Sequence, residues 1–238
     1  MSTARSMRVA ALALVLAAGS AMAVENSSLS ATRAAGVSTL VLSGQTVHAT
    51  TNPIINQKLI EVANSSKVIA TWDEVQLNGS VQHFYGLSLD GRAFAQVQPT
   101  TYDIRLAYAT FDPRAGEPFV PPSLAADKNC KVYLVQFVMP PIDEFRRNVA
   151  NLGGAVEAFL TDHTQIVTMD AATAAKVAAL PYVRWVGKYH PAYRLEQSVR
   201  NDILSAANAP AKRYSIQVHR RGMAQQQTIG DAVTKSGG

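Results

Sequence analysis

Alternating apolar and polar residues mark the first part of the chain that has a clear pattern. Between residues 67 and 111 the alternation has a period close to two, which predicts strands buried on one face. The dipeptides Asn78-Gly79 and Asp90-Gly91 interrupt it and favour tight turns. We therefore expect a small antiparallel β module over residues 67–111. Its predicted strands are residues 68–72, 81–89, 92–98 and 102–109.

The pattern changes after a Pro-rich linker at residues 112–130. Residues 131–138 are almost continuously apolar, which is typical of a buried strand. Pro140-Pro141 then opens a segment with apolar residues at helical spacing, and Gly153-Gly154 ends it. This segment is predicted to be an amphipathic helix.

The same organisation then continues through a second helix. Residues 155–160 and 165–169 are predicted strands, and residues 171–180 form a predicted helix that Asp170 can cap. A fourth strand is expected at residues 183–186. The order is βαββαβ, so we expect an α+β fold with a ferredoxin-like domain over residues 131–195, preceded by the β module.

A partial repeat is expected at the C-terminus. Residues 214–218 share the pattern of residues 133–137, and a candidate helix that ends in Gly237-Gly238 follows them. Residues 196–238 are therefore predicted to form a linker and an incomplete second βα repeat. This pattern suggests a shortened product or a fragment of a longer chain.

The N-terminal segment has the pattern of an export signal. Arg5 and Arg8 precede an apolar run at residues 9–18, and Ala21-Met22-Ala23 supplies small residues for cleavage. Residues 1–23 are therefore a predicted signal peptide, which implies a secreted or periplasmic protein with no membrane segment after its removal. Residues 24–66 are rich in Ser, Thr and Ala and are expected to be a partly ordered leader.

Composition and charge narrow the classes of function. With 47% hydrophobic and 16% charged residues, the chain has the composition of a folded protein. The net charge of +5 is dispersed, without a basic stripe, so we expect no nucleic-acid partner. The single cysteine, Cys130, excludes an intramolecular disulfide and a cysteine-based zinc site. No two of the five histidines have helical ligand spacing, so we expect neither a metal nor a cofactor.

A distinctive pattern is found at residues 85–92, 111–113, 132–137, 153–156, 169–174 and, most specifically, 180–194. These stretches resemble the N-terminal region of secreted bacterial subtilisin-like serine peptidases. The resemblance covers residue 72 to the C-terminus and is strongest over residues 132–194. It implies a unit similar to the subtilisin propeptide, which assists folding of the protease domain and blocks its cleft.

The sequence departs from that family at the residues that perform catalysis. The family's protease domain carries Asp before Ser/Thr-Gly, His before Gly-Thr, and Ser within Gly-Thr-Ser-Met-Ala, and none of these motifs occurs here. Acyl transfer needs the nucleophile, base and orienting acid together. We therefore assign no catalytic residue and expect this chain not to be an enzyme.

Two main functions follow as hypotheses. The first is a propeptide-like fragment that acts on a subtilisin-like protease domain of its own chain, as folding assistant or inhibitor. The second is a stand-alone secreted inhibitor acting in trans, or a protein- or cell-wall-binding module. Five residues are candidates for partner contact, with packing of the fourth strand as the alternative: Trp185, Tyr189, His190, Pro191 and Tyr193. Four aromatic residues could line a sugar-binding surface or pack inside the β module: Trp72, Phe84, Tyr85 and Tyr102.

Overall fold

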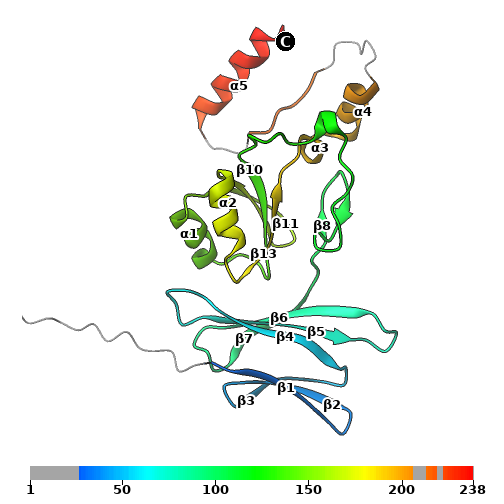
Figure 1. Cartoon of the computed structure of the whole chain (residues 1–238), viewed down its shortest axis with the longest axis vertical. Coiled ribbons are helices and arrows are strands. Elements are labelled where there is room, and N and C mark those ends of the chain that lie inside the picture. The colour runs from blue at the N-terminus through cyan, green and yellow to red at the C-terminus, as the bar shows by residue number, and fades with distance from the viewer. Residues whose placement is uncertain (1–26, 206–212, 219–221, 238) are drawn as a thin grey trace, which may run out of the picture.

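The computed structural model describes residues 27–205, 213–218 and 222–237 (Figure 1). The predicted signal peptide lies outside the described residues. The fold is α+β and contains several antiparallel sheets. The predicted fold class, α+β, is therefore confirmed. Within the described part of the chain, no helix combines the length and apolar character needed to cross a membrane.

The first sheet consists of β1 (Leu29–Ala34), β2 (Val37–Leu42) and β3 (Gln45–Thr50). Its two hairpin loops are Ala35-Gly36 and Ser43-Gly44, in which all four residues have positive φ. This conformation matches the twist of the paired strands. The prediction of a partly ordered leader is therefore wrong for this segment. The strands are short, and Ala and Ser stand where hairpin turns usually carry Asn or Asp.

The second sheet has the order β4-β5-β6-β7 and is antiparallel throughout. The predicted hairpin at Asn78-Gly79 is confirmed, with the Gly79 N–H donating to the Gln76 carbonyl over 2.9 Å. The sheet begins before the predicted module because β4 comes from the leader segment. The four strands are β4 (Ile54–Glu61), β5 (Val68–Val75), β6 (Val81–Ser88) and β7 (Phe94–Thr100).

The first two sheets pack face to face around Trp72. Its indole ring is 1% exposed and stacks with Phe84 and Phe94 at centroid distances of 5.6 and 6.0 Å. Leu40 of β2 and Ala70 of β5 complete this buried cluster. Leu40 packs on this aromatic stack of the second sheet, so burial of apolar surface joins the two sheets.

The third sheet has the order β11-β12-β10-β13, and every neighbouring pair is antiparallel. Helix α1 follows its first strand in the chain, and helix α2 follows its third strand. All four strands and both helices predicted for residues 131–195 are present. They are β10 (Val132–Phe137), α1 (Asp143–Asn151), β11 (Ala155–Thr161), β12 (Thr164–Thr168), α2 (Ala171–Ala178) and β13 (Val183–Lys188).

Local sequence explains where these helices begin and end. The Asp170 carboxylate accepts a hydrogen bond of 2.7 Å from the Thr173 N–H, as an N-cap requires. Gly153 ends the α1 segment with a φ of 98°, which strongly favours glycine. Phe145 and Val149 of α1 and Val177 of α2 are fully buried against the sheet.

One hydrophobic core connects the second and third sheets. Ile69 and Leu87, on the face of the second sheet opposite Trp72, belong to the same cluster as Phe137 and Phe145. At the edge of this contact, Lys67 Nζ lies 2.5 Å from Glu144 Oε1. Figure 1 shows the resulting arrangement, with β4–β7 between the first sheet and the α1/α2/β10 layer.

The other face of the third sheet is covered by β8 (Ile104–Arg105), β9 (Thr110–Phe111), η1 (Pro122–Leu124) and α3 (Pro191–Arg194). We call the apolar cluster under these elements the back core. Its buried residues are Ile104, Phe111, Leu124, Leu134, Ile166, Tyr189, Ala192 and Tyr193.

The prediction that residues 102–109 form a strand of the β module is wrong. Tyr102 and Ile104 do alternate inward as the pattern indicated, but only Ile104–Arg105 pairs, with β9. Ile104 packs in the back core against the third sheet. Alternation reports which side chains are buried, but it does not identify the sheet that buries them.

The C-terminal part adds α4 (Gln197–Ser205) and α5 (Met223–Lys235). The predicted helix is confirmed as α5, whereas the predicted strand at residues 214–218 is wrong because this segment forms no ladder. A strand requires a hydrogen-bonded partner. Within the described residues, none pairs with this segment.

Candidate partner-binding surface

The five candidate contact residues lie at and after the end of β13. Tyr189 and Tyr193 are each only 5% exposed and belong to the back core. Trp185, His190 and Pro191 are partly buried. The structure thus gives these residues a packing role, and the prediction of direct partner contact remains untested.

Trp185 lies against its own strand. A Cβ added to Gly187 would be 1.9 Å from Trp185 Cζ2, which is far inside van der Waals contact. Glycine is therefore required for this placement of the ring. The indole covers the strand and packs against the back core.

Buried Tyr193 and partly buried His190 lie next to each other at the end of β13. His190 Nδ1 accepts a hydrogen bond of 2.9 Å from the Ala126 N–H, and its ring is perpendicular to that of Tyr193 at 5.0 Å. Burial lowers the pKa of His190 and raises the pKa of Tyr193 to about 12. The Tyr193 hydroxyl is buried and finds no hydrogen-bond partner among the described residues. Both side chains are therefore neutral at physiological pH.

Residues 116–121 pass over this region, and we call them the Phe119 segment. The Tyr108 hydroxyl donates a hydrogen bond of 2.5 Å to the Phe119 carbonyl. The Tyr108 ring lies 5.4 Å from the Tyr193 ring and is tilted by 51° to it. Glu117 is close enough to Tyr193 for its charge to influence that hydroxyl. The Phe119 side chain is 79% exposed. Sequence patterning missed it because a lone Phe in a Pro-rich linker has no periodicity.

A second cluster connects the linker to the third sheet. Arg184 binds Asp112 in a bidentate pair, with N···O distances of 2.5 and 2.7 Å, and donates to Gln136 Oε1 over 2.9 Å. Its guanidinium also lies 4.1 Å from the centre of the Tyr102 ring. Burial opposes ionisation of Asp112, but the Arg184 hydrogen bonds hold its pKa below the ordinary value. Because these groups satisfy one another, the cluster is structural.

Two histidines lie where the second sheet meets the third. His83 Nδ1 is 2.5 Å from Asp73 Oδ1, and His163 Nε2 is 2.5 Å from the Thr100 hydroxyl. Acyl transfer requires a carboxylate and a hydroxyl on the same imidazole. Here the carboxylate and the hydroxyl contact different imidazoles, so this arrangement does not activate a nucleophile.

Glu74 is the centre of a buried polar cluster between β3 and β5. It accepts hydrogen bonds from His48 at 2.7 Å, Thr50 at 2.9 Å and Asn52 at 3.1 Å. Burial alone would raise the pKa of Glu74, but the hydrogen bonds hold it below the ordinary value. The hydroxyl donates to the carboxylate and not to the imidazole, so this cluster also lacks an activated nucleophile.

The four aromatic residues considered for sugar binding lie mainly inside the protein. Trp72, Tyr85 and Tyr102 are buried, and Phe84 packs against the cluster around Trp72. An exposed aromatic platform is therefore not formed by these residues. Over the described ranges, no three His, Cys, Asp or Glu side chains gather as metal ligands would.

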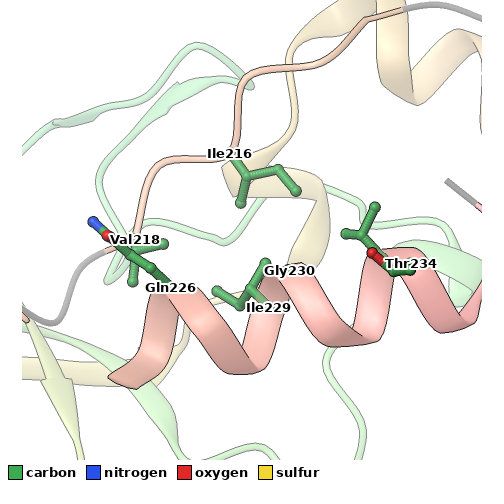
Figure 2. Close-up of a pocket in the computed structure, with 7 residues that line it drawn as sticks. Ile216, Val218, Gln226, Ile229, Gly230 and Thr234 are labelled. Carbon is green, nitrogen blue, oxygen red and sulfur yellow. The ribbon is translucent and has the colours of Figure 1, made fainter. Parts of the chain in front are cut away.

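An open pocket of about 450 Å³ lies between residues 216–218 and α5 (Figure 2). Figure 2 shows Ile216 on the extended segment above the helix and Ile229 on the helix side facing it. None of the α5 residues is fully buried. The pocket is lined by Ile216, Val218, Gln226, Ile229, Gly230, Val233 and Thr234.

Comparison with known proteins gives one match. Residues 105–190 match a family model described as a domain of unknown function (DUF8729), which covers less than half of the chain. This segment runs from β8 through β13 to His190, so it includes the third sheet, the linker and part of the back core. No curated protein and no solved structure matches the chain.

Proposed function

We propose that residues 131–195 form a ferredoxin-like unit and that the protein is a non-catalytic, propeptide-like partner of a subtilisin-like protease domain. In this proposal it acts as a folding assistant or an inhibitor, in cis or in trans. Export through the predicted signal peptide at residues 1–23, to a secreted or periplasmic location, is part of the same proposal.

The observation that carries the proposal is the strand order β11-β12-β10-β13. In chain order, the first and third strands occupy the centre of this antiparallel sheet, and each is followed by a helix packed in the shared core. This is the arrangement expected of a split βαβ unit. The resemblance of residues 132–194 to subtilisin-like propeptides supports the same interpretation from the sequence.

The polar clusters support a non-catalytic role. The carboxylates of Asp73 and Glu74 each contact a histidine, but the nearby hydroxyls contact a different imidazole or the carboxylate itself. Nucleophile activation requires the imidazole to lie between the two groups. In this proposal the protein therefore acts by binding another polypeptide.

The experiment is an inhibition and refolding assay with subtilisin. The purified protein, at micromolar excess, should slow cleavage of a peptide substrate or increase the yield of active subtilisin after dilution from denaturant. Val177→Asp supplies a control, because it places a charge in the fully buried core under α2. Absence of both effects with the folded wild-type protein would contradict the proposal.

A further inference from the structure

The geometry points to the Phe119 segment as the part of this protein that enters the partner's cleft. We propose that the Phe119 side chain fills an apolar pocket of a protein that binds extended peptide segments. This inference rests on the proposed function, because the partner it specifies is a subtilisin-like protease domain.

The first argument is the contrast in exposure within one aromatic region. Phe111 and Tyr193 are buried in the back core, and Tyr108 is partly buried beside them. Phe119 is 79% exposed although its backbone carbonyl is bonded to Tyr108. A large aromatic side chain that projects from a packed base is the kind of residue that anchors protein interfaces.

The second argument is the rigidity of the segment. Pro118 and Pro121 restrict the backbone on both sides of Phe119, and Pro121 has the extended values φ −55° and ψ 139°. Val120 packs against the back core, so the residue next to Phe119 is held in place. A segment ordered before binding loses little conformational entropy in the complex.

The third argument is the match between this segment and a protease cleft. Residues 116–121 form neither helix nor strand and are held on the surface by Tyr108 and Val120. Protease clefts bind extended chains, and a hydrophobic specificity pocket accepts one large side chain. One projecting Phe on an anchored surface segment, with extended backbone at Pro121, has the required form.

Two residues that the sequence predicted to contact a partner have a different role in this inference. Tyr193 and His190 support the segment from below: Tyr193 contacts Tyr108, and His190 binds the Ala126 N–H in the connection that follows. They are positioning residues, and Phe119 makes the contact with the partner.

The test uses subtilisin whose nucleophilic serine is replaced by alanine, so that the bound segment cannot be cleaved. Binding of the wild-type protein is measured by calorimetry beside Phe119→Ala, Phe119→Leu and Leu77→Ala. Leu77 is a fully exposed apolar residue in the β5–β6 turn and serves as the matched control. Circular dichroism establishes that each variant retains the wild-type fold.

We expect Phe119→Ala to raise Kd about tenfold or more, because this truncation removes an anchor side chain. Phe119→Leu should lose less affinity, and Leu77→Ala should bind as the wild type does. If the wild-type protein binds and Phe119→Ala binds equally well, the inference about Phe119 is wrong and the proposed function stands. If the wild-type protein does not bind this protease, both are overturned.

Discussion

Arg184 links segments of the chain that are distant in sequence. It projects from β13, binds Asp112 at the start of the linker and contacts Gln136 on β10. Gln136 is fully buried and in turn donates to the Tyr102 carbonyl over 2.8 Å. One guanidinium group therefore fixes the start of the linker to the third sheet.

Replacing Arg184 by methionine is expected to lower the free energy of unfolding by about 3 kcal/mol. Methionine keeps an apolar stem, but it leaves the Asp112 carboxylate and Gln136 Oε1 without the hydrogen bonds that Arg184 donates. Urea unfolding followed by circular dichroism measures the change. The double variant Arg184→Met with Asp112→Asn should recover part of the loss, since it removes the unpaired carboxylate. A single variant as stable as wild type would show that the pair contributes little.

Secondary structure was predictable where periodicity and end signals agree. The strands and helices of residues 131–188 follow from apolar spacing together with Asp170 and Gly153, both of which end or begin helices in the structure. The first sheet was not predictable in the same way, because Ala35 and Ser43 adopt positive φ in its turns. Such a conformation depends on strand pairing more than on the local residue type.

The candidate surface was predictable only in part. Sequence analysis selected Tyr189 and Tyr193, which the structure places in the back core below the Phe119 segment. Phe119 itself could not be selected, since its exposure depends on the Tyr108 hydroxyl and on the packing of Val120. These are tertiary contacts, and no local pattern encodes them.

The β11–β12 hairpin is expected to make a pH-dependent contact with β7. Its turn residue His163 has Nε2 2.5 Å from Thr100 Oγ1 and packs edge-on against Tyr85 at 6.1 Å. Burial lowers the pKa of His163, and the neighbouring Asp162 only partly opposes this effect. Asp162 is itself paired with Arg105. The contact between the hairpin and the second sheet is therefore most favourable when His163 is neutral.

The sign of the pH effect follows from this lowered pKa. When the contact opens, His163 regains an ordinary pKa near 6.5 and binds a proton more readily. The contact should be fully stable above about pH 7 and should weaken as the pH falls below that ordinary value. Amide hydrogen exchange of residues 94–100, corrected for intrinsic rates, should be faster at pH 5 than at pH 7.5. His163→Gln cannot titrate and should reduce the difference. An equal pH response in the variant would assign the effect to other groups.

At the scale of the whole molecule, the second and third sheets share a single core. Ile69, Leu87 and Tyr85 of the second sheet are buried in the same cluster as Phe137 and Tyr182 of the third-sheet unit. A domain that unfolded alone would expose this shared surface on both parts. Hydrophobic burial thus couples them, and we expect the two parts to unfold together.

The chain's two tryptophans allow this coupling to be measured, because Trp72 lies between the first two sheets and Trp185 lies on β13. In Trp72→Phe and in Trp185→Phe, the fluorescence transition of the remaining indole in urea should coincide with the circular dichroism transition of the same variant.

Leu87→Ala tests the coupling directly. This residue belongs to the second sheet, but its side chain is buried in the shared core. The substitution should therefore lower the stability reported by Trp185 in the other unit by about 2–3 kcal/mol. Leu89→Ala, two residues away and half exposed, should leave that transition nearly unchanged. If Leu87→Ala shifted only the Trp72 transition, the sheets would be independent domains, and a partner bound to the Phe119 segment would not stabilise the N-terminal sheets. If both transitions shift together, binding at that segment stabilises the molecule from the first sheet to β13.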